Sequence, residues 1–229
     1  MRRLFRSRSG WTEFLFLIVG IMIGLLLNYF VQAVSPDSLQ DFLRDLLPEA
    51  VGITFTVFIL DRLNSAREER QLKDMLTRRA HSRYNHTALE AIEDMRVLGY
   101  LEKGILAGKE LRGSNWQSAN LYKADLSNCD LTNAVLKNAD FVYANLRDAK
   151  ISEKQLMQTE TMYGAIMPDG KKYDGRYNLS GDFAFAKRSN VDMGSPEDMA
   201  LWYGVSIETY LQGQQWARNN LPAYQQPRG

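Results

Sequence analysis

Residues that could carry nucleophilic or acid–base chemistry are few in this sequence. It holds one cysteine, Cys129, and two histidines, His81 and His86. A Cys–His or Ser–His couple needs the base within hydrogen-bond reach of the nucleophile, and both histidines precede the segment that holds Cys129. The histidines are five residues apart and have no carboxylate at ligand spacing, so we expect surface or capping roles rather than metal ligation.

Motifs that would supply catalysis in another way do not occur in the sequence. It contains no Walker-type phosphate loop, no GxSxG elbow and no HExxH pair. We therefore predict a protein that is not an enzyme, with no catalytic residues, no cofactor and no metal site.

Length, charge and cysteine usage limit the class of protein. The chain has 229 residues and a net charge of +1, which gives no general attraction to nucleic acid. A single cysteine excludes an internal disulfide framework and any multi-cysteine zinc or iron–sulfur site. The composition fits a reducing compartment.

The N-terminal region contains a long apolar segment from Phe14 to Val34. These 21 residues carry no charged side chain, and a helix of that length spans about 31 Å, close to a hydrocarbon core of about 30 Å. A cleaved signal peptide is the alternative, since arginines precede the segment, but signal cores are usually shorter. We expect a retained transmembrane helix over about 12–34.

A second apolar block runs from Ala50 to Leu60, between Glu49 and Asp61. It has only 11 residues, so a re-entrant segment competes with a second span over about 47–62. Basic residues flank both blocks on their outer sides, while the connecting loop is acidic. The positive-inside rule then favours a hairpin over 11–62 with both termini cytoplasmic. The expected localisation is an integral membrane protein of a bacterial inner membrane or a thylakoid.

The remaining boundaries follow from composition. Residues 1–10 form a basic cytoplasmic N-terminus. Residues 63–104 are rich in helix formers and mixed charge, which predicts a helical connector.

The strongest signal is a period of five residues between Ser114 and Ile151. Every fifth residue is large and apolar: Trp116, Leu121, Leu126, Leu131, Leu136, Phe141, Leu146 and Ile151. The residue two places before each of these is small: Ser114, Ala119, Ala124, Cys129, Ala134, Ala139, Ala144 and Ala149. This period fits neither a helix, at about 3.6 residues, nor a strand, at about two. It predicts a chain that turns after every five residues and presents the same two positions inward, so that stacked coils form a solenoid.

The repeated unit, as in Ala119-Asn120-Leu121-Tyr122-Lys123, resembles that of the pentapeptide-repeat family. The resemblance implies a right-handed quadrilateral β-helix with four pentapeptides in each coil, here over residues 105–170. The expected fold class is an α+β membrane protein. It combines an N-terminal transmembrane helical hairpin, a helical connector, a short right-handed quadrilateral β-helix of pentapeptide repeats and a small α-helical C-terminal cap over 171–229.

The repeat also assigns roles to residues that could otherwise suggest chemistry. Asp125, Asp130 and Asp140 lie at repeat spacing, where short polar side chains bond to the local backbone in turns. They are expected to be turn residues rather than a general acid–base pair. Cys129 occupies an inward small-residue position and is expected to be a buried packing residue.

The function that follows is a membrane-anchored, non-catalytic scaffold with a cytoplasmic protein-interaction surface. Because the inward positions are occupied by the repeat, contacts would come from exposed positions. The candidates are Tyr122, Lys123, Lys137, Tyr143 and Arg147. Expected partners are the lipid bilayer and an unidentified protein, with no nucleic acid. A homo-oligomer through the transmembrane helices is a further expectation, since Gly20 and Gly24 form a GxxxG spacing.

Two other functions compete with this one. A small oligomeric channel or transport accessory subunit would use Asn28, Glu49 and the GxxxG face, because intramembrane polar groups are functional candidates. DNA mimicry would need a long acidic rod, whereas segment 110–170 holds eight acidic and six basic residues. The channel or transport subunit stays as the alternative, and DNA mimicry is disfavoured.

Overall fold

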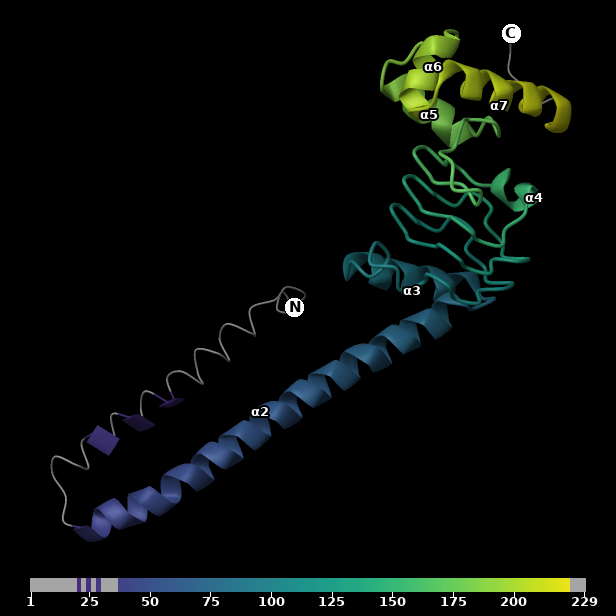
Figure 1. Ribbon diagram of the computed structural model, residues 1–229. Helices are drawn as coiled ribbons and strands as arrows, with labels where there is room; N and C mark the ends of the chain where they lie inside the picture. The colour runs from purple at the N-terminus through teal and green to yellow at the C-terminus, as the bar shows by residue number, and fades with distance from the viewer. Residues whose placement is uncertain (1–19, 22–23, 26–27, 30–36, 223–229) are drawn as a thin grey trace. The chain divides into compact units, whose positions relative to one another are not determined.

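The computed structural model describes residues 20–21, 24–25, 28–29 and 37–222 (Figure 1). Contacts divide the chain into two compact units, Met1–Glu68 and Glu69–Gly229. The described residues form α2 (Asp37–Ala80), α3 (Asn85–Val97), α4 (Glu153–Leu156), α5 (Ser180–Arg188), α6 (Pro196–Tyr203) and α7 (Ile207–Asn220).

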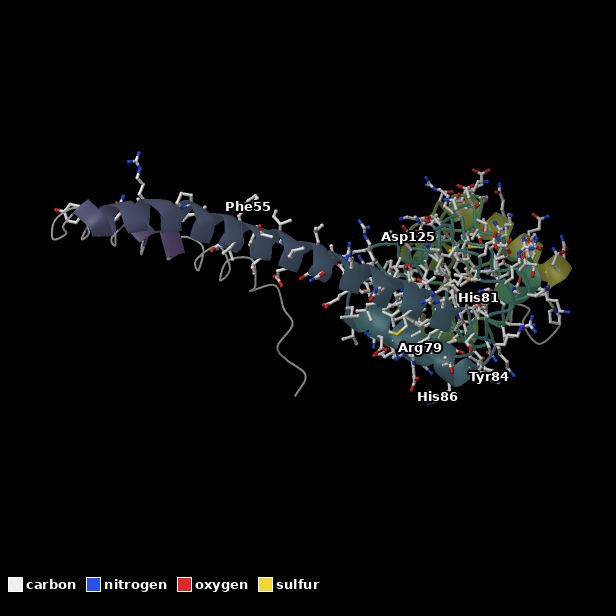
Figure 2. All side chains as sticks on the ribbon, turned by 90° about the horizontal axis from the view of Figure 1, so that it is seen from below. Phe55, Arg79, His81, Tyr84, His86 and Asp125 are labelled. Carbon is white, nitrogen blue, oxygen red and sulfur yellow. The ribbon has the colours of Figure 1, made fainter. Side chains whose placement is uncertain are left out.

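In the first unit, α2 carries apolar side chains that are open to solvent. Val51, Ile53, Phe55 and Val57 are between 60% and 65% exposed. Phe55 stands out from the side of the helix (Figure 2). At about 100° per residue these positions lie on several sides of α2, so the apolar character does not form a single stripe.

The predicted membrane hairpin is wrong. Within the described part of the chain, no helix is both long enough and apolar enough to cross a membrane. Only 11 residues of α2 separate Glu49 from Asp61, which is about 16 Å of helix, roughly half of a hydrocarbon core. This finding overturns the span at 47–62 and the integral-membrane localisation, and removes the basis of the channel alternative. The predicted span at 12–34 falls mostly outside the described residues.

In the second unit, the last turns of α2 and the helix α3 contribute apolar side chains to the same core as the coils. Apolar side chains from both helices are buried, among them Leu76, Ala80 and Ile92. Arg79 bridges to Glu90 of α3, with 2.7 Å between the charged atoms. The helices form because their sequences are rich in strong helix formers, and burial in the shared core fixes their position on the coils.

Residues from about 106 to 167 form stacked coils that turn after every five residues. Parallel bridges pair a residue with the one 20 places later, as in Asn115 with Val135 and Asn120 with Asp140. Backbone hydrogen bonds follow the same register: the Leu121 N–H donates to the carbonyl of Asp140 at 2.8 Å. Figure 1 shows these coils between α3 at one end and α5–α7 at the other.

The prediction of a β-helix needs correction, because no strand forms among the described residues. The contacts between coils are isolated bridges of a single residue pair. Each five-residue side ends in a turn residue with positive φ, such as Asn128, Asn133 and Asn138 at 57–59°. The backbone therefore leaves the extended conformation before two consecutive residues can pair.

Asparagine and aspartate side chains stabilise these turns locally. Asn120 Oδ1 accepts from the Tyr122 N–H at 3.1 Å, and Asp140 Oδ1 accepts from the Val142 N–H at 2.9 Å. Such bonds satisfy backbone donors that the turn leaves unpaired.

The α2–α3 pair covers the first edge of the coils. The carbonyl of Ser82 accepts the Asn115 N–H at 2.9 Å, where a preceding coil would otherwise supply the acceptor. The Trp116 indole N–H donates to the carbonyl of Ala80 at 2.7 Å. The end of α2 and the loop that joins it to α3 thus complete the hydrogen bonding of an edge that would otherwise pair with other chains.

At the opposite edge, one extra residue interrupts the register. Asp140 uses both its N–H and its carbonyl in the ladder. In the next coil Glu160 supplies the donor, to Ala139, and Thr161 supplies the acceptor, for Phe141. Two residues thus take the place of one, as in a β-bulge. Bridges in this part of the stack join residues 21 apart, such as Asp140 and Thr161.

Helix α5 docks on this bulge and ends the stack. The Gly181 N–H donates to the carbonyl of Glu160 at 3.0 Å. A Cβ on Gly181 would lie 2.5 Å from that carbonyl oxygen, so only glycine allows the approach. Tyr203 of α6 and Trp216 of α7 then join Tyr173 and Tyr177 in an aromatic cluster.

Candidate functional site

The structure encloses the residues of the five-residue repeat. Of the sixteen named positions, fifteen are buried and Ile151 is partly buried. The large side chains stack along the axis of the coils, and the small ones let the turns close against them. This buried interior is a packing feature.

Cys129 belongs to this interior. Its thiol donates to the carbonyl of Leu106 at 2.7 Å. Burial raises the pKa of the Cys129 thiol to about 11. A thiol that is enclosed and protonated at neutral pH is a poor nucleophile.

The five predicted contact residues are all exposed, but the fold brings only three of them together. Tyr122, Lys123 and Tyr143 share one side: the two rings are 6.0 Å apart at 84°, and Lys123 Nζ lies 5.3 Å from the Tyr122 ring centroid. Arg147 lies on the next five-residue side of the coil. Lys137 lies on the five-residue side that precedes the one with Tyr143, so neither residue shares the side of the two tyrosines.

The shared side continues into the C-terminal helices as a row of aromatic rings. Tyr143 meets Tyr163 edge-on, with ring centroids 5.4 Å apart. Tyr163 lies 4.3 Å from Trp202 of α6. We name Tyr122, Tyr143 and Tyr163 the tyrosine ladder. In this ladder the side chain of Tyr122 is 40% exposed and that of Tyr143 is 46% exposed.

Backbone geometry sets the position of Tyr143 in the ladder. Tyr143 has φ 57°, the left-handed conformation that ends each five-residue side. The equivalent residue of the next coil is Gly164, where a Cβ would lie 2.5 Å from the Tyr143 ring. The missing side chain of Gly164 therefore creates the space in which the ring packs.

On another side of the coils, charged residues bridge successive coils. Arg112 and Lys150 both approach Asp130 Oδ2, at 2.6 and 3.7 Å. Hydrogen bonds from Thr132 and Arg112 hold the pKa of Asp130 well below its usual range. Asp130 is thus a paired structural carboxylate and not a proton donor.

The histidines take structural positions at the first edge of the coils. His81 Nε2 lies 2.9 Å from the carbonyl oxygen of Arg112. His86 projects from α3 and is 3.5 Å from Glu90 (Figure 2). No cluster of metal-binding side chains occurs within the residues that the structure describes.

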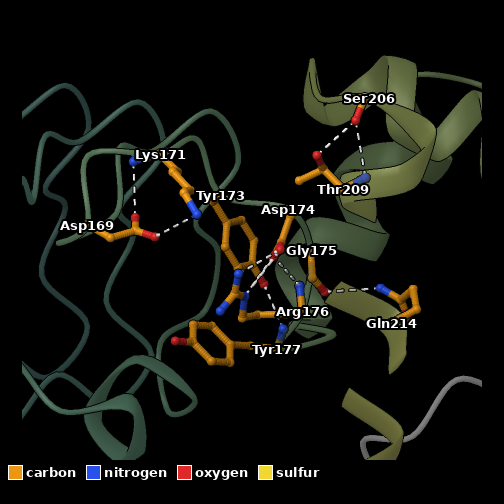
Figure 3. Close-up of polar contacts among 10 residues, drawn as sticks. All are labelled: Asp169, Lys171, Tyr173, Asp174, Gly175, Arg176, Tyr177, Ser206, Thr209 and Gln214. Atoms are coloured by element: carbon orange, nitrogen blue, oxygen red, sulfur yellow. Dashed lines mark hydrogen bonds and ion pairs between the residues drawn. The ribbon is translucent and has the colours of Figure 1, made fainter. Parts of the chain in front are cut away.

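A second surface feature is a groove of about 500 Å³ at the last edge of the coils, which we name the end groove. It lies between α4, the turn 167–172, the loop 174–177 and α7. Its lining residues are Ile151, Glu153, Leu156, Met167, Pro168, Asp169, Lys171, Lys172, Asp174, Arg176, Tyr177, Thr209, Gln212 and Trp216. Figure 3 shows the polar contacts that build its wall.

The wall of the end groove is held by one strong ion pair. Asp174 accepts from the Arg176 side chain, with distances of 3.0 and 3.2 Å to Nε and 2.8 Å to Nη2. The Arg176 guanidinium also lies 5.9 Å from the Trp216 ring centroid. The Gln214 amide donates to the carbonyl of Gly175 at 3.4 Å and ties the loop to α7 (Figure 3).

Comparison with known families identifies the coil segment. The family described as pentapeptide repeats matches residues 100–133 and 119–153. Residues 100–153 are pentapeptide repeats. The comparisons with curated proteins and with solved structures gave no match. The pentapeptide-repeat match ends at the first residue of α4, just before the register changes.

Two features beyond the pentapeptide repeats were not predicted from the sequence. The first is the extra residue at 160–161. Its signal in the sequence is the spacing of six residues, in place of five, between the large apolar residues Leu156 and Met162. The second is the buried carboxylate of Asp182, which has no such signal. It accepts from the Thr161 hydroxyl at 2.6 Å and the Met162 N–H at 3.1 Å, and only the folded chain brings these groups together.

Proposed function

We propose that the protein is a non-catalytic pentapeptide-repeat scaffold that binds another protein through the tyrosine ladder. The observation that carries this proposal is the pair of exposed rings, Tyr122 and Tyr143, on a rigid support. Tyrosine is enriched at protein interfaces because it offers a large amphipathic surface and loses little conformational entropy on binding.

The ladder is preorganised for such a contact. Edge-to-face packing and the space above Gly164 hold Tyr143 in place. Tyr163 and Trp202 fix the inner end of the row against the C-terminal helices. A surface that is already ordered loses less free energy on association than a mobile one.

The chemistry of the ladder indicates what a partner should offer. The exposed rings suit an apolar side chain packed against their faces. Lys123, beside Tyr122, is exposed and has no ion pair among the described residues. A partner with an apolar anchor next to a carboxylate fits this surface best.

A capture experiment with matched variants tests the proposal. Full-length wild type, the double variant Tyr122→Ala/Tyr143→Ala and the control Lys137→Ala would be immobilised and exposed to lysate. Lys137 is exposed on a different side of the coils. We expect at least one protein to be retained by wild type and Lys137→Ala and lost from the double variant. Equal retention by all three would contradict a role for the ladder.

A further inference from the structure

We propose that the end groove is a second protein-binding site, which takes a peptide segment with a bulky apolar side chain between a basic and an acidic residue. None of the residues that line it belongs to the tyrosine ladder. The inference therefore goes beyond the proposed function and does not depend on it.

The floor of the end groove suits an apolar anchor. Leu156, Met167 and Tyr177 are buried, and Ile151 and Trp216 are partly exposed among them. The volume of about 500 Å³ falls within the range of specific ligand sites, about 300–1,000 Å³. It can enclose one large side chain together with adjoining backbone.

Packing contacts hold the walls of the end groove in place. Tyr177 packs edge-on against Trp216, with centroids 5.4 Å apart, and stacks with Tyr173 at 5.7 Å. A Cβ on Gly213 would lie 2.9 Å from the Asp174 carboxylate, so α7 approaches the loop as closely as glycine allows. These contacts fix both sides of the end groove before any partner arrives.

The charges of the end groove define the polarity of its ligand. Four of its six charged residues pair with each other: Asp174 with Arg176, and Asp169 with Lys171 at 3.9 Å. The other two, Glu153 and Lys172, form no ion pair within the described residues. One carboxylate and one ammonium group are thus left for a ligand to match.

This balance favours a peptide over a free ion. Three acidic and three basic residues line the end groove, so its net charge draws neither anions nor cations. A segment with a base toward Glu153 and an acid toward Lys172 matches both unpaired groups. Thr209 and Gln212 on α7 add side chains that can hydrogen-bond to its backbone.

Charge reversal on the full-length protein tests the proposal. A display library of random 12-residue peptides would be panned against wild type, and the enriched peptides synthesised for affinity measurement. We expect an enriched apolar residue with basic and acidic neighbours. Lys172→Glu and Glu153→Lys should each weaken binding three- to tenfold. The double variant Glu153→Lys/Lys172→Glu should prefer a peptide with the two charges exchanged. Both side chains are exposed, so the variants should keep the fold.

Two controls separate this site from the rest of the molecule. Lys137→Glu reverses an exposed charge on another side and should leave peptide affinity unchanged. Tyr122→Ala/Tyr143→Ala should also leave it unchanged, whether or not the ladder binds a partner.

Several results would overturn the proposal. These are the absence of such a peptide motif, affinities insensitive to both charge reversals, or loss of peptide binding in the ladder variant. Binding that emerges only after removal of residues 223–229 would assign the end groove to the chain's own C-terminal segment.

Discussion

The carboxylate of Asp182 accepts a hydrogen bond from the Met162 N–H, at 3.1 Å. The equivalent amide of the preceding coil, at Phe141, donates to a carbonyl of the next coil. A side chain of α5 therefore takes the place of a missing coil. This explains how the pentapeptide repeats end without an unpaired edge.

The same contact predicts an unusual pH dependence of stability. Burial raises the pKa of Asp182 from 3.8 to about 6. Between these values the folded protein holds a proton that the unfolded chain releases, so the contribution of Asp182 is most favourable below about pH 4. It declines as the pH rises to about 6, by about 3 kcal/mol in total.

Replacing the carboxylate with a neutral amide should remove this slope. Asp182→Asn keeps an oxygen acceptor for Thr161 and Met162, and we expect it to be about 1–3 kcal/mol more stable than wild type at pH 7. Urea unfolding of both proteins from pH 4 to pH 7 would measure the difference. Asp182→Ala, which removes the acceptor, should be destabilised. A wild type that gains stability relative to Asp182→Asn as the pH rises would contradict the assignment.

Ser114 offers a stabilising substitution within the repeat. Its hydroxyl oxygen is the one buried side-chain polar atom without a hydrogen-bond partner in the described residues. Ser114→Ala removes this unsatisfied group, places the alanine that the repeat uses at most equivalent positions, and should raise the free energy of unfolding by about 1 kcal/mol.

Chemical denaturation of Ser114→Ala beside Ser152→Ala would check this. The Ser152 hydroxyl accepts from the Gln155 N–H and caps α4, so that variant should lose about 1 kcal/mol. Destabilisation by Ser114→Ala would show that its hydroxyl makes a favourable interaction.

A glycine pair isolates the space that the ladder needs. Gly164→Ala and Gly113→Ala both place a side chain at φ 68°, which should cost each variant about 1 kcal/mol. Only at Gly164 would the new Cβ collide with the Tyr143 ring, whereas nothing lies within 4 Å of Gly113. We expect partner capture to fall with Gly164→Ala and to persist with Gly113→Ala. Equal capture by the two variants would show that binding does not depend on the orientation of Tyr143.

Cys129 should resist modification in the native protein. Its burial and its raised pKa, about 11, leave almost no accessible thiolate at pH 8. A thiol reagent at pH 8 should therefore label Cys129 slowly in buffer and rapidly in denaturant, as followed by intact mass. Rapid stoichiometric labelling of the folded chain would contradict the buried position.

The inward positions could be read from the sequence because a five-residue period repeats the same environment many times. The structure places Trp116 to Leu146 inside, as that pattern requires. Pairing between coils could not be read in the same way. The turns at Asn128 and Asn133 limit it to isolated bridges, so the family's expected β-helix does not appear as strands.

The parts outside the repeat were harder to predict because they have no periodicity. The apolar block at 50–60 suggested a span, yet it is a short part of a longer charged helix. Asp182, Lys172 and Trp216 lie outside the five-residue period, and their roles arise from contacts between distant segments. Tyr122 and Tyr143 were foreseen as exposed, but their meeting depends on the coil register.

The affinity of a captured partner for the ladder variants tests the central claim most directly. Once a partner is identified, isothermal titration calorimetry would compare wild type, Tyr122→Ala/Tyr143→Ala and Lys137→Ala. We expect the ladder variant to bind at least tenfold more weakly, because truncating two central aromatic contacts typically costs at least about 1.4 kcal/mol. Lys137→Ala should bind as wild type does. An unchanged dissociation constant for the ladder variant would contradict the claim that the tyrosine ladder is the binding surface.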